Sequence, residues 1–156
     1  MRTPPFYLLI SVFFLLPSIL QAEEPLALFQ VRQVIADDTP GAEKFPDGTG
    51  VRNAPYAVAK EVLLDASDLQ SVRAGVDHSG HPQVLISLTE SSRQAWARTT
   101  QESLGKQLAI IVDGQVLLAP VLQSPIPGGQ IAITGNYSTE EVQAIAAKLQ
   151  RFTAGE

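Results

Sequence analysis

Residues 107–135 read QLAIIVDGQVLLAPVLQSPIPGGQIAITG, a stretch rich in Ile, Leu, Val and Ala in which Asp113 is the only charged residue. Asp113 and Gly114 suit a two-residue hairpin turn, because both residue types tolerate left-handed backbone angles. Proline cannot donate a hydrogen bond to a strand ladder, so Pro120 ends the second strand. The stretch therefore begins with a hairpin, whose strands we expect over 107–113 and 115–119.

A third strand, QIAIT at 130–134, follows the turn-forming segment SPIPGG. Gly128 and Gly129 allow unusual backbone angles where the chain enters this strand, and Gly135 follows its last residue. The sequence thus places three strands in one apolar ribbon.

Both faces of the first of these strands are apolar, since alternate residues of a strand point to opposite faces. Leu108, Ile110 and Val112 share one face, which we assign to the core. Two interpretations remain for the opposite face, which carries Ala109 and Ile111. It is covered by the first strand and the long loop of the chain, or it is an exposed platform for a partner. In the second case an extended peptide pairs with a strand edge, and the contact residues are Ile111, Leu117 and Gln130.

Two helices flank the ribbon. Residues 89–104 form the first, with Thr89 as its cap, Trp96 and Thr100 facing inward, and Gly105 ending it in a left-handed conformation. The second follows Ser138, which forms a capping box with Glu141. Its apolar stripe consists of residues at the spacing of one helical face, namely Val142, Ile145, Ala146 and Leu149. We expect this stripe to cover a sheet.

Shorter strands precede the first helix. We expect one over 26–35, one over 56–64 and a hairpin formed by 69–77 and 82–88. Residues 37–55 are rich in Pro, Gly and Asp and predict a mobile surface loop. The fold class is therefore α+β: an antiparallel or mixed sheet with two helices packed on one face, ferredoxin-like in general layout.

Length and composition favour one exported domain. The chain has 156 residues, 45% of them hydrophobic, and no cysteine, so no disulfide braces it. Residues 1–22 resemble a signal peptide cleaved after Ala22, with Arg2 before an apolar run that Pro17 interrupts. Removing them changes the net charge from −5 to −6, because Arg2 is their only charged residue. This charge argues against a nucleic-acid partner, and no membrane span is expected in the mature chain.

The sequence offers little chemistry. His78 and His81, together with Asp77, supply three potential metal ligands, but a hairpin turn holds them loosely, so they are weak metal candidates. Glu140 and Glu141 are explained by the dipole at the start of a helix. We find no nucleophile elbow and no phosphate-binding loop. The chain is therefore expected to be no enzyme and to use no cofactor.

Four landmarks stand in order along the chain: ISLTESSRQAWARTT, LGKQLAIIVDGQVLLAPV, IPGGQIAITGNY and STEEVQAIAAKL. Together they resemble the head subdomain in the first periplasmic domain of SecD, a membrane subunit that assists preprotein export. The resemblance covers most of residues 29–150, although Ser92 stands where that family commonly has glycine. The family pattern, with its turns and caps, involves Trp96, Thr100, Gly105, Asp113, Gly114, Pro120, Gly128, Gly129, Gly135, Ser138 and Glu141.

The sequence pattern predicts a signal peptide at 1–22 and an N-terminal strand and mobile loop at 23–55, and the resemblance implies a SecD head-like domain at 56–152. It implies binding of unfolded or translocating polypeptide in the periplasm, or after secretion. Proton-driven pulling is not implied, because that activity belongs to membrane helices. The alternative is a structural or regulatory protein with another partner in the envelope, since a fold does not fix a function.

Overall fold

The structure is a computed structural model that describes residues 29–153. Its helices are α1 (Glu90–Glu102) and α2 (Thr139–Thr153), and a short 3-10 turn, η1 (Ala66–Asp68), precedes β5. The predicted signal peptide, residues 1–22, lies outside the described residues. The strands are β1 (Phe29–Gln33), β2 (Glu43–Phe45), β3 (Tyr56–Val58), β4 (Leu64–Asp65), β5 (Leu69–Val76), β6 (Pro82–Leu88), β7 (Leu108–Val112), β8 (Gln115–Leu118) and β9 (Gln130–Thr134).

Strand β7 lies inside a four-stranded sheet of order β4-β1-β7-β8, here called the β7 sheet. It pairs antiparallel with β1 on one edge and with β8 on the other. The turn between β7 and β8 consists of Asp113 and Gly114, whose φ angles of 51° and 74° are left-handed. The predicted hairpin is confirmed, and its two-residue turn matches the twist of the strands.

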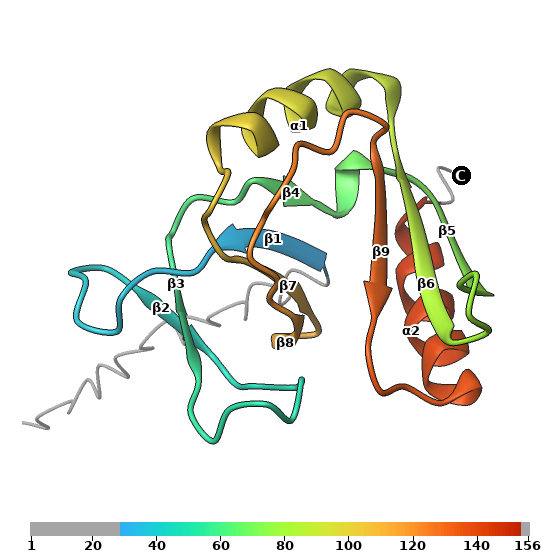
Figure 1. Cartoon of the computed structure of the whole chain (residues 1–156), viewed down its shortest axis with the longest axis horizontal. Coiled ribbons are helices and arrows are strands. Elements are labelled where there is room, and N and C mark those ends of the chain that lie inside the picture. Colours follow the sequence, from blue (N-terminus) through green and yellow to red (C-terminus); the bar gives the residue numbers. More distant parts are fainter. Residues whose placement is uncertain (1–28, 154–156) are drawn as a thin grey trace, which may run out of the picture.

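Strand β9 does not join the β7 sheet, although it follows β8 in the chain. It pairs antiparallel with β6 and ends a three-stranded sheet of order β5-β6-β9, here called the β6 sheet. Figure 1 shows β9 (orange) beside β6, with β7 and β8 apart from it. The α+β class is confirmed, but the apolar ribbon is divided between two sheets and is not part of one.

Each helix packs on a different part of the core. Helix α2 lies along β5 and β6 (Figure 1), where Val142, Ala146 and Leu149 are buried. Helix α1 buries Trp96 in the same cluster, next to residues of the β7 sheet. The predicted stripe of α2 therefore does cover a sheet, the one formed by β5, β6 and β9.

The second face of β7 is covered by an arm, residues 43–58, that contains β2 and β3. Ala109 and Ile111 are buried there against Tyr56 and Val58. This confirms a covered face, with the cover coming from the arm, since β1 pairs along the edge of β7. Ile111 is 1% exposed, so its assignment as a polypeptide contact is corrected: the arm shields it.

Arg32 of β1 fastens the arm to the sheet. Its guanidinium donates to Glu43 Oε2 at 2.7 Å and lies 5.5 Å from the ring centroid of Phe45. Arg32 is itself buried, and Nε donates to Gln30 Oε1 at 2.7 Å. The predicted boundary between an N-terminal segment and a head-like domain, at residues 55 and 56, stays a prediction. Strands β2 and β3, which lie on either side of it, pair with one another.

Both helix caps form as the sequence predicts. The backbone N–H of Ser138 donates to Glu141 Oε2 at 2.7 Å, and the N–H of Glu141 donates to Ser138 Oγ at 3.2 Å. Thr89 accepts from the N–H of Ser92 at the start of α1. After α1, Gly105 has a φ of 77°. These local contacts fix where each helix begins and where α1 stops.

Thr100 links α1 to the segment between β8 and β9, here called the linker (residues 119–129). Its hydroxyl donates to the carbonyl of Trp96 at 2.9 Å and accepts from the N–H of Ile126 at 3.0 Å. Because Thr100 is fully buried, the bond to Ile126 satisfies a group that would otherwise be costly. The linker therefore runs against α1 before it enters β9.

We predict that Trp96→Ala lowers the free energy of unfolding by about 3–5 kcal/mol, because it removes a buried aromatic side chain. Ser138→Ala removes one cap and should cost only about 1 kcal/mol. Guanidinium denaturation of both variants, monitored by far-UV circular dichroism, measures the difference. Equal losses for the two variants would contradict the placement of Trp96 in the core.

Candidate functional site

An apolar slot of about 120 Å³ lies between the two sheets, next to α1. The β7 sheet forms one wall, β9 forms the other, and the linker closes it from the side. Among the lining residues, only Gln130 and Trp96 have side chains with a polar group. The lining residues are Val31, Trp96, Leu108, Ile110, Leu118, Pro120, Leu122, Ile126, Gln130, Ile131 and Ala132.

Trp96 is the only buried residue of the slot lining whose side chain carries a polar group. The side chain is 3% exposed, and its Nε1–H has no acceptor among residues 29–153. Buried donors normally have partners, so this N–H is an unsatisfied polar group in the core next to the slot. Trp96 is also the only tryptophan of the chain.

The two glycines before β9 differ in the space around them. Gly129 has a φ of 62°, and a Cβ there would lie 2.5 Å from Cγ of Arg93. The Arg93 side chain therefore passes directly over this glycine. Gly128 has open space around it, so of the two predicted special positions only Gly129 requires glycine.

The remaining predicted contacts fall in different places. Gln130 is exposed and lines the slot, as does Pro120. Leu117 is partly buried, and its carbonyl accepts from Tyr137 Oη at 2.6 Å, on the other side of β8. A Cβ on Gly135 would come within 2.8 Å of the Tyr137 ring, so Gly135 makes room for Tyr137.

Sequence inspection missed part of the slot. Leu122 and Ile126 were not singled out, and Ala132 looked like an ordinary strand residue. The available signal was the apolar side chains of the linker, which alternate with prolines in PVLQSPIP. That pattern does not reveal a slot by itself, because it depends on which sheet β9 joins.

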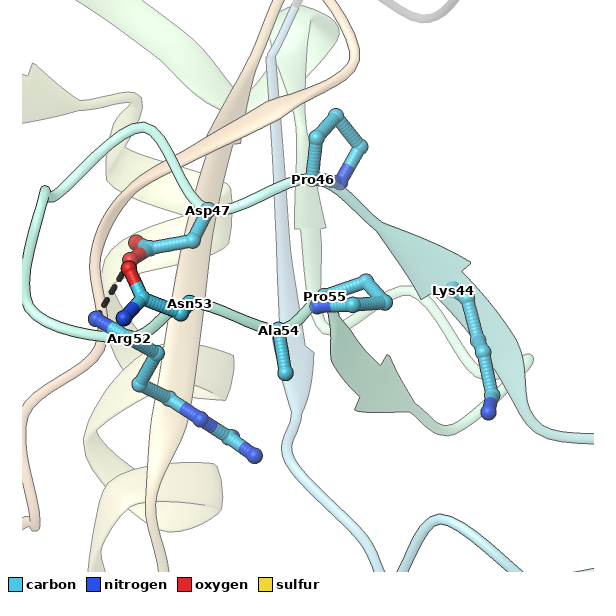
Figure 2. A pocket seen from close by; sticks show the side chains of 7 residues that line it. All are labelled: Lys44, Pro46, Asp47, Arg52, Asn53, Ala54 and Pro55. Carbon is cyan, nitrogen blue, oxygen red and sulfur yellow. Dashed lines mark hydrogen bonds between the residues drawn. The ribbon is translucent and has the colours of Figure 1, made fainter.

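A second, open concavity of about 480 Å³ lies on the arm and is shown in Figure 2. The carboxylate of Asp47, which lines this concavity, is hydrogen-bonded within its own loop. It accepts from the hydroxyl of Thr49 at 2.5 Å and from the N–H of Arg52 at 2.6 Å. These bonds, the hydroxyl of Thr49 first, hold the pKa of Asp47 below its ordinary value. The Arg52 guanidinium lies 4.6 Å from the ring centroid of Tyr56. The polar groups therefore serve to close the loop.

The weak metal candidates lie in the turn between β5 and β6. Asp77 Oδ1 accepts from the N–H of Ser79 at 2.7 Å and of His81 at 2.9 Å, and Oδ2 lies 3.3 Å from His81 Nδ1. These bonds, led by the one from the His81 N–H, lower the pKa of Asp77. His78 is exposed. Within residues 29–153 no group of three or more His, Cys, Asp or Glu side chains is arranged to hold a metal ion.

Comparison with known proteins decides the family. The family of the SecDF P1 head subdomain matches residues 42–152. The chain belongs to this family. It is 41% identical over 88 residues to the protein translocase subunit SecDF of Thermus thermophilus, covering 56% of this chain and 12% of that protein. It is 34% identical over 113 residues to SecD of Aquifex aeolicus, covering 72% of this chain and 22% of that protein.

Solved structures agree with this assignment. A SecDF structure, described as that of a membrane component that enhances protein export, matches with a TM-score of 0.64 and 27% identity. The match covers 86% of this chain and 70% of that chain. SecDF in a super-membrane-facing form matches with the same TM-score, over 81% of this chain and 19% of that one. The chain spans about a fifth or less of the two relatives above.

The SecD head family is thus established for this chain, and with it a relation to protein-export machinery. Between residues 29 and 153, no helix combines the length and the apolar character needed to cross a membrane. The family match begins at residue 42, so β1 precedes the matched region while pairing with β7 inside it.

We predict that Asp47→Asn loosens the loop of the arm, because a neutral amide accepts hydrogen bonds less strongly than a carboxylate. Trypsin should then cleave after Arg52 faster than in the wild type at neutral pH. The depressed pKa means that this restraint is present at neutral pH and is lost only as the pH falls through the folded value, below 3.8. Equal cleavage rates would show that Asp47 does not hold the loop.

Proposed function

We propose that the chain is an exported, non-catalytic SecD head-like domain that binds unfolded or translocating polypeptide in connection with protein export. The observation that carries this proposal is the apolar slot between the two sheets, which lies beside an exposed stretch of β9. Unfolded chains differ from folded ones in offering both apolar side chains and unpaired backbone groups. The family, whose relatives are translocase subunits, supports the same direction.

The slot suits weak and unselective binding. It is lined almost entirely by apolar side chains, so it recognises hydrophobicity and no particular polar group. An extended polypeptide loses conformational freedom on binding, and this cost offsets much of what the apolar contacts supply. Weak binding permits rapid release, which suits a polypeptide that is still being translocated.

The location that we propose is the periplasm or the exterior, reached with the signal peptide at residues 1–22 cleaved after Ala22. Partners in that compartment are an unfolded polypeptide or another protein of the export machinery or envelope. No cofactor is required by this function. A mature charge of −6, the −5 of the whole chain less Arg2, favours basic segments, and salt should weaken that preference.

We predict that the envelope form of the protein begins at Glu23. Intact-mass measurement of the protein recovered from a bacterial envelope fraction tests this directly, since loss of residues 1–22 changes the mass by a known amount. A protein that starts at Met1 in the membrane fraction would contradict cleavage.

We predict that the mature domain binds an unfolded preprotein and does not bind the same protein once folded. Titration of each form, followed by the fluorescence of Trp96 against a preprotein that lacks tryptophan, should give saturation only with the unfolded form. The affinity should fall as salt is added. Equal binding of both forms, or of neither, would refute polypeptide binding and favour a structural or regulatory role in the envelope.

A further inference from the structure

Among residues 29–153, strand β9 has one edge without a strand partner. In the β6 sheet it pairs with β6 alone, and its other side faces the linker (Figure 1). Residues of both β9 and the linker line the slot. The N–H of Leu88 donates to the carbonyl of Gly129 at 2.8 Å. Because hydrogen-bonded pairs alternate along an antiparallel ladder, Ile131 and Ile133 direct their backbone groups to β6. Gln130, Ala132 and Thr134 direct theirs away from it.

The outward groups have no use inside the described part of the chain. Outside the strand ladders, no hydrogen bond among residues 29–153 involves the N–H or carbonyl of Gln130, Ala132 or Thr134, and the alternation along β9 turns these groups away from β6. The side chains of all three are exposed. Five residues with this arrangement form a template for one more strand.

The edge of β8, on the opposite wall, is closed. The N–H of Val116 donates to the carbonyl of Pro46 at 3.0 Å, and the carbonyl of Val116 accepts from Gly48 at 2.9 Å. The carbonyl of Leu117 accepts from Tyr137. The arm and Tyr137 therefore occupy β8, whereas β9 lacks such cover within residues 29–153.

The sequence of β9 does nothing to discourage pairing. Exposed edges usually carry a charged residue, a proline or a bulge that prevents another strand from adding. QIAIT has no charged residue and no proline, and its register with β6 is regular over all five residues. An open edge of this kind either promotes aggregation or serves as a binding site.

The slot beside the edge favours the binding site. Gln130, Ile131 and Ala132 belong to both, so a strand added to β9 would run along the mouth of the slot. A volume of about 120 Å³ is close to that of cavities that hold a benzene-sized group.

We propose that β9 binds an extended client segment as a fourth strand of the β6 sheet. The backbone of the segment pairs with Gln130, Ala132 and Thr134, and one large apolar side chain enters the slot. This inference rests on the proposed function and names the surface and the mode of binding. A second copy of the chain is a poorer occupant, because its own Ile131 and Ile133 are buried and cannot fill the slot.

The test uses the mature protein and a short synthetic peptide in which leucine and serine alternate between terminal lysines. Amide hydrogen exchange, followed by NMR, is measured with and without the peptide. The N–H groups of Gln130, Ala132 and Thr134 should become protected on binding, while those of Ile131 and Ile133 are protected already. This alternation distinguishes strand addition from contact with side chains alone. The fluorescence of Trp96 should shift in the same titration.

A matched pair of variants tests the backbone donor. Proline is tolerated on an edge strand where the N–H points outward, so Ala132→Pro removes one outward donor and no bond to β6. It should weaken peptide binding about threefold to tenfold, the effect of one net hydrogen bond, while Ala132→Ser, which keeps the N–H, should bind the peptide more tightly than Ala132→Pro. If circular dichroism shows that Ala132→Pro does not fold, the wild-type protein is titrated instead with a peptide in which alternate amides are N-methylated. This peptide should bind more weakly than the unmethylated one.

The outcomes separate this inference from the proposed function. Peptide and unfolded preprotein that bind without protecting the three amides would overturn strand addition and leave polypeptide binding in place. Absence of binding by both would overturn the two together. Protection of the same amides without peptide, rising with protein concentration, would assign the edge to pairing between copies and overturn the client segment.

Discussion

Burial of β7 on both faces is the constraint on which the rest of the structure depends. All five of its residues are buried, and both of its edges are paired. A strand of this kind needs two apolar covers, since removal of apolar surface from water is what stabilises it. One cover is the main core, which holds Trp96 and the stripe of α2; the other is the arm.

The need for a second cover explains the arm. Residues 37–55 look like a solvent-exposed loop by composition, yet the arm packs Tyr56 and Val58 on β7 and is tied to β1 by Arg32. The arm also closes β8 through Pro46 and Gly48. One short segment thereby protects the second face of the central strand and the edge of its neighbour.

Local features were predictable because they depend on few residues. The turn at Asp113 and Gly114, the capping box at Ser138 and Glu141, and the left-handed Gly105 shortly after the end of α1 follow from the conformations those residues favour. The partner of β9 was not predictable, because alternation of Ile131 and Ile133 fits an edge on β8 as well as one on β6. The slot exists only because β9 pairs with β6. The sequence therefore indicated Gln130 and Pro120 as residues of interest but not that both line one slot. Ile111 was misjudged because nothing in the loop sequence shows that it folds back.

The division of the ribbon between two sheets links the fold to recognition of unfolded chains. A segment that pairs through its backbone with β9 needs no particular sequence, and the slot requires only that one side chain be large and apolar. Folded proteins have few free backbone groups, because nearly all are paired within their own secondary structure. The combination therefore discriminates by the state of the client and not by its identity. Had β9 joined β8, the ribbon would have one continuous sheet, and neither the free edge nor the slot beside it would exist.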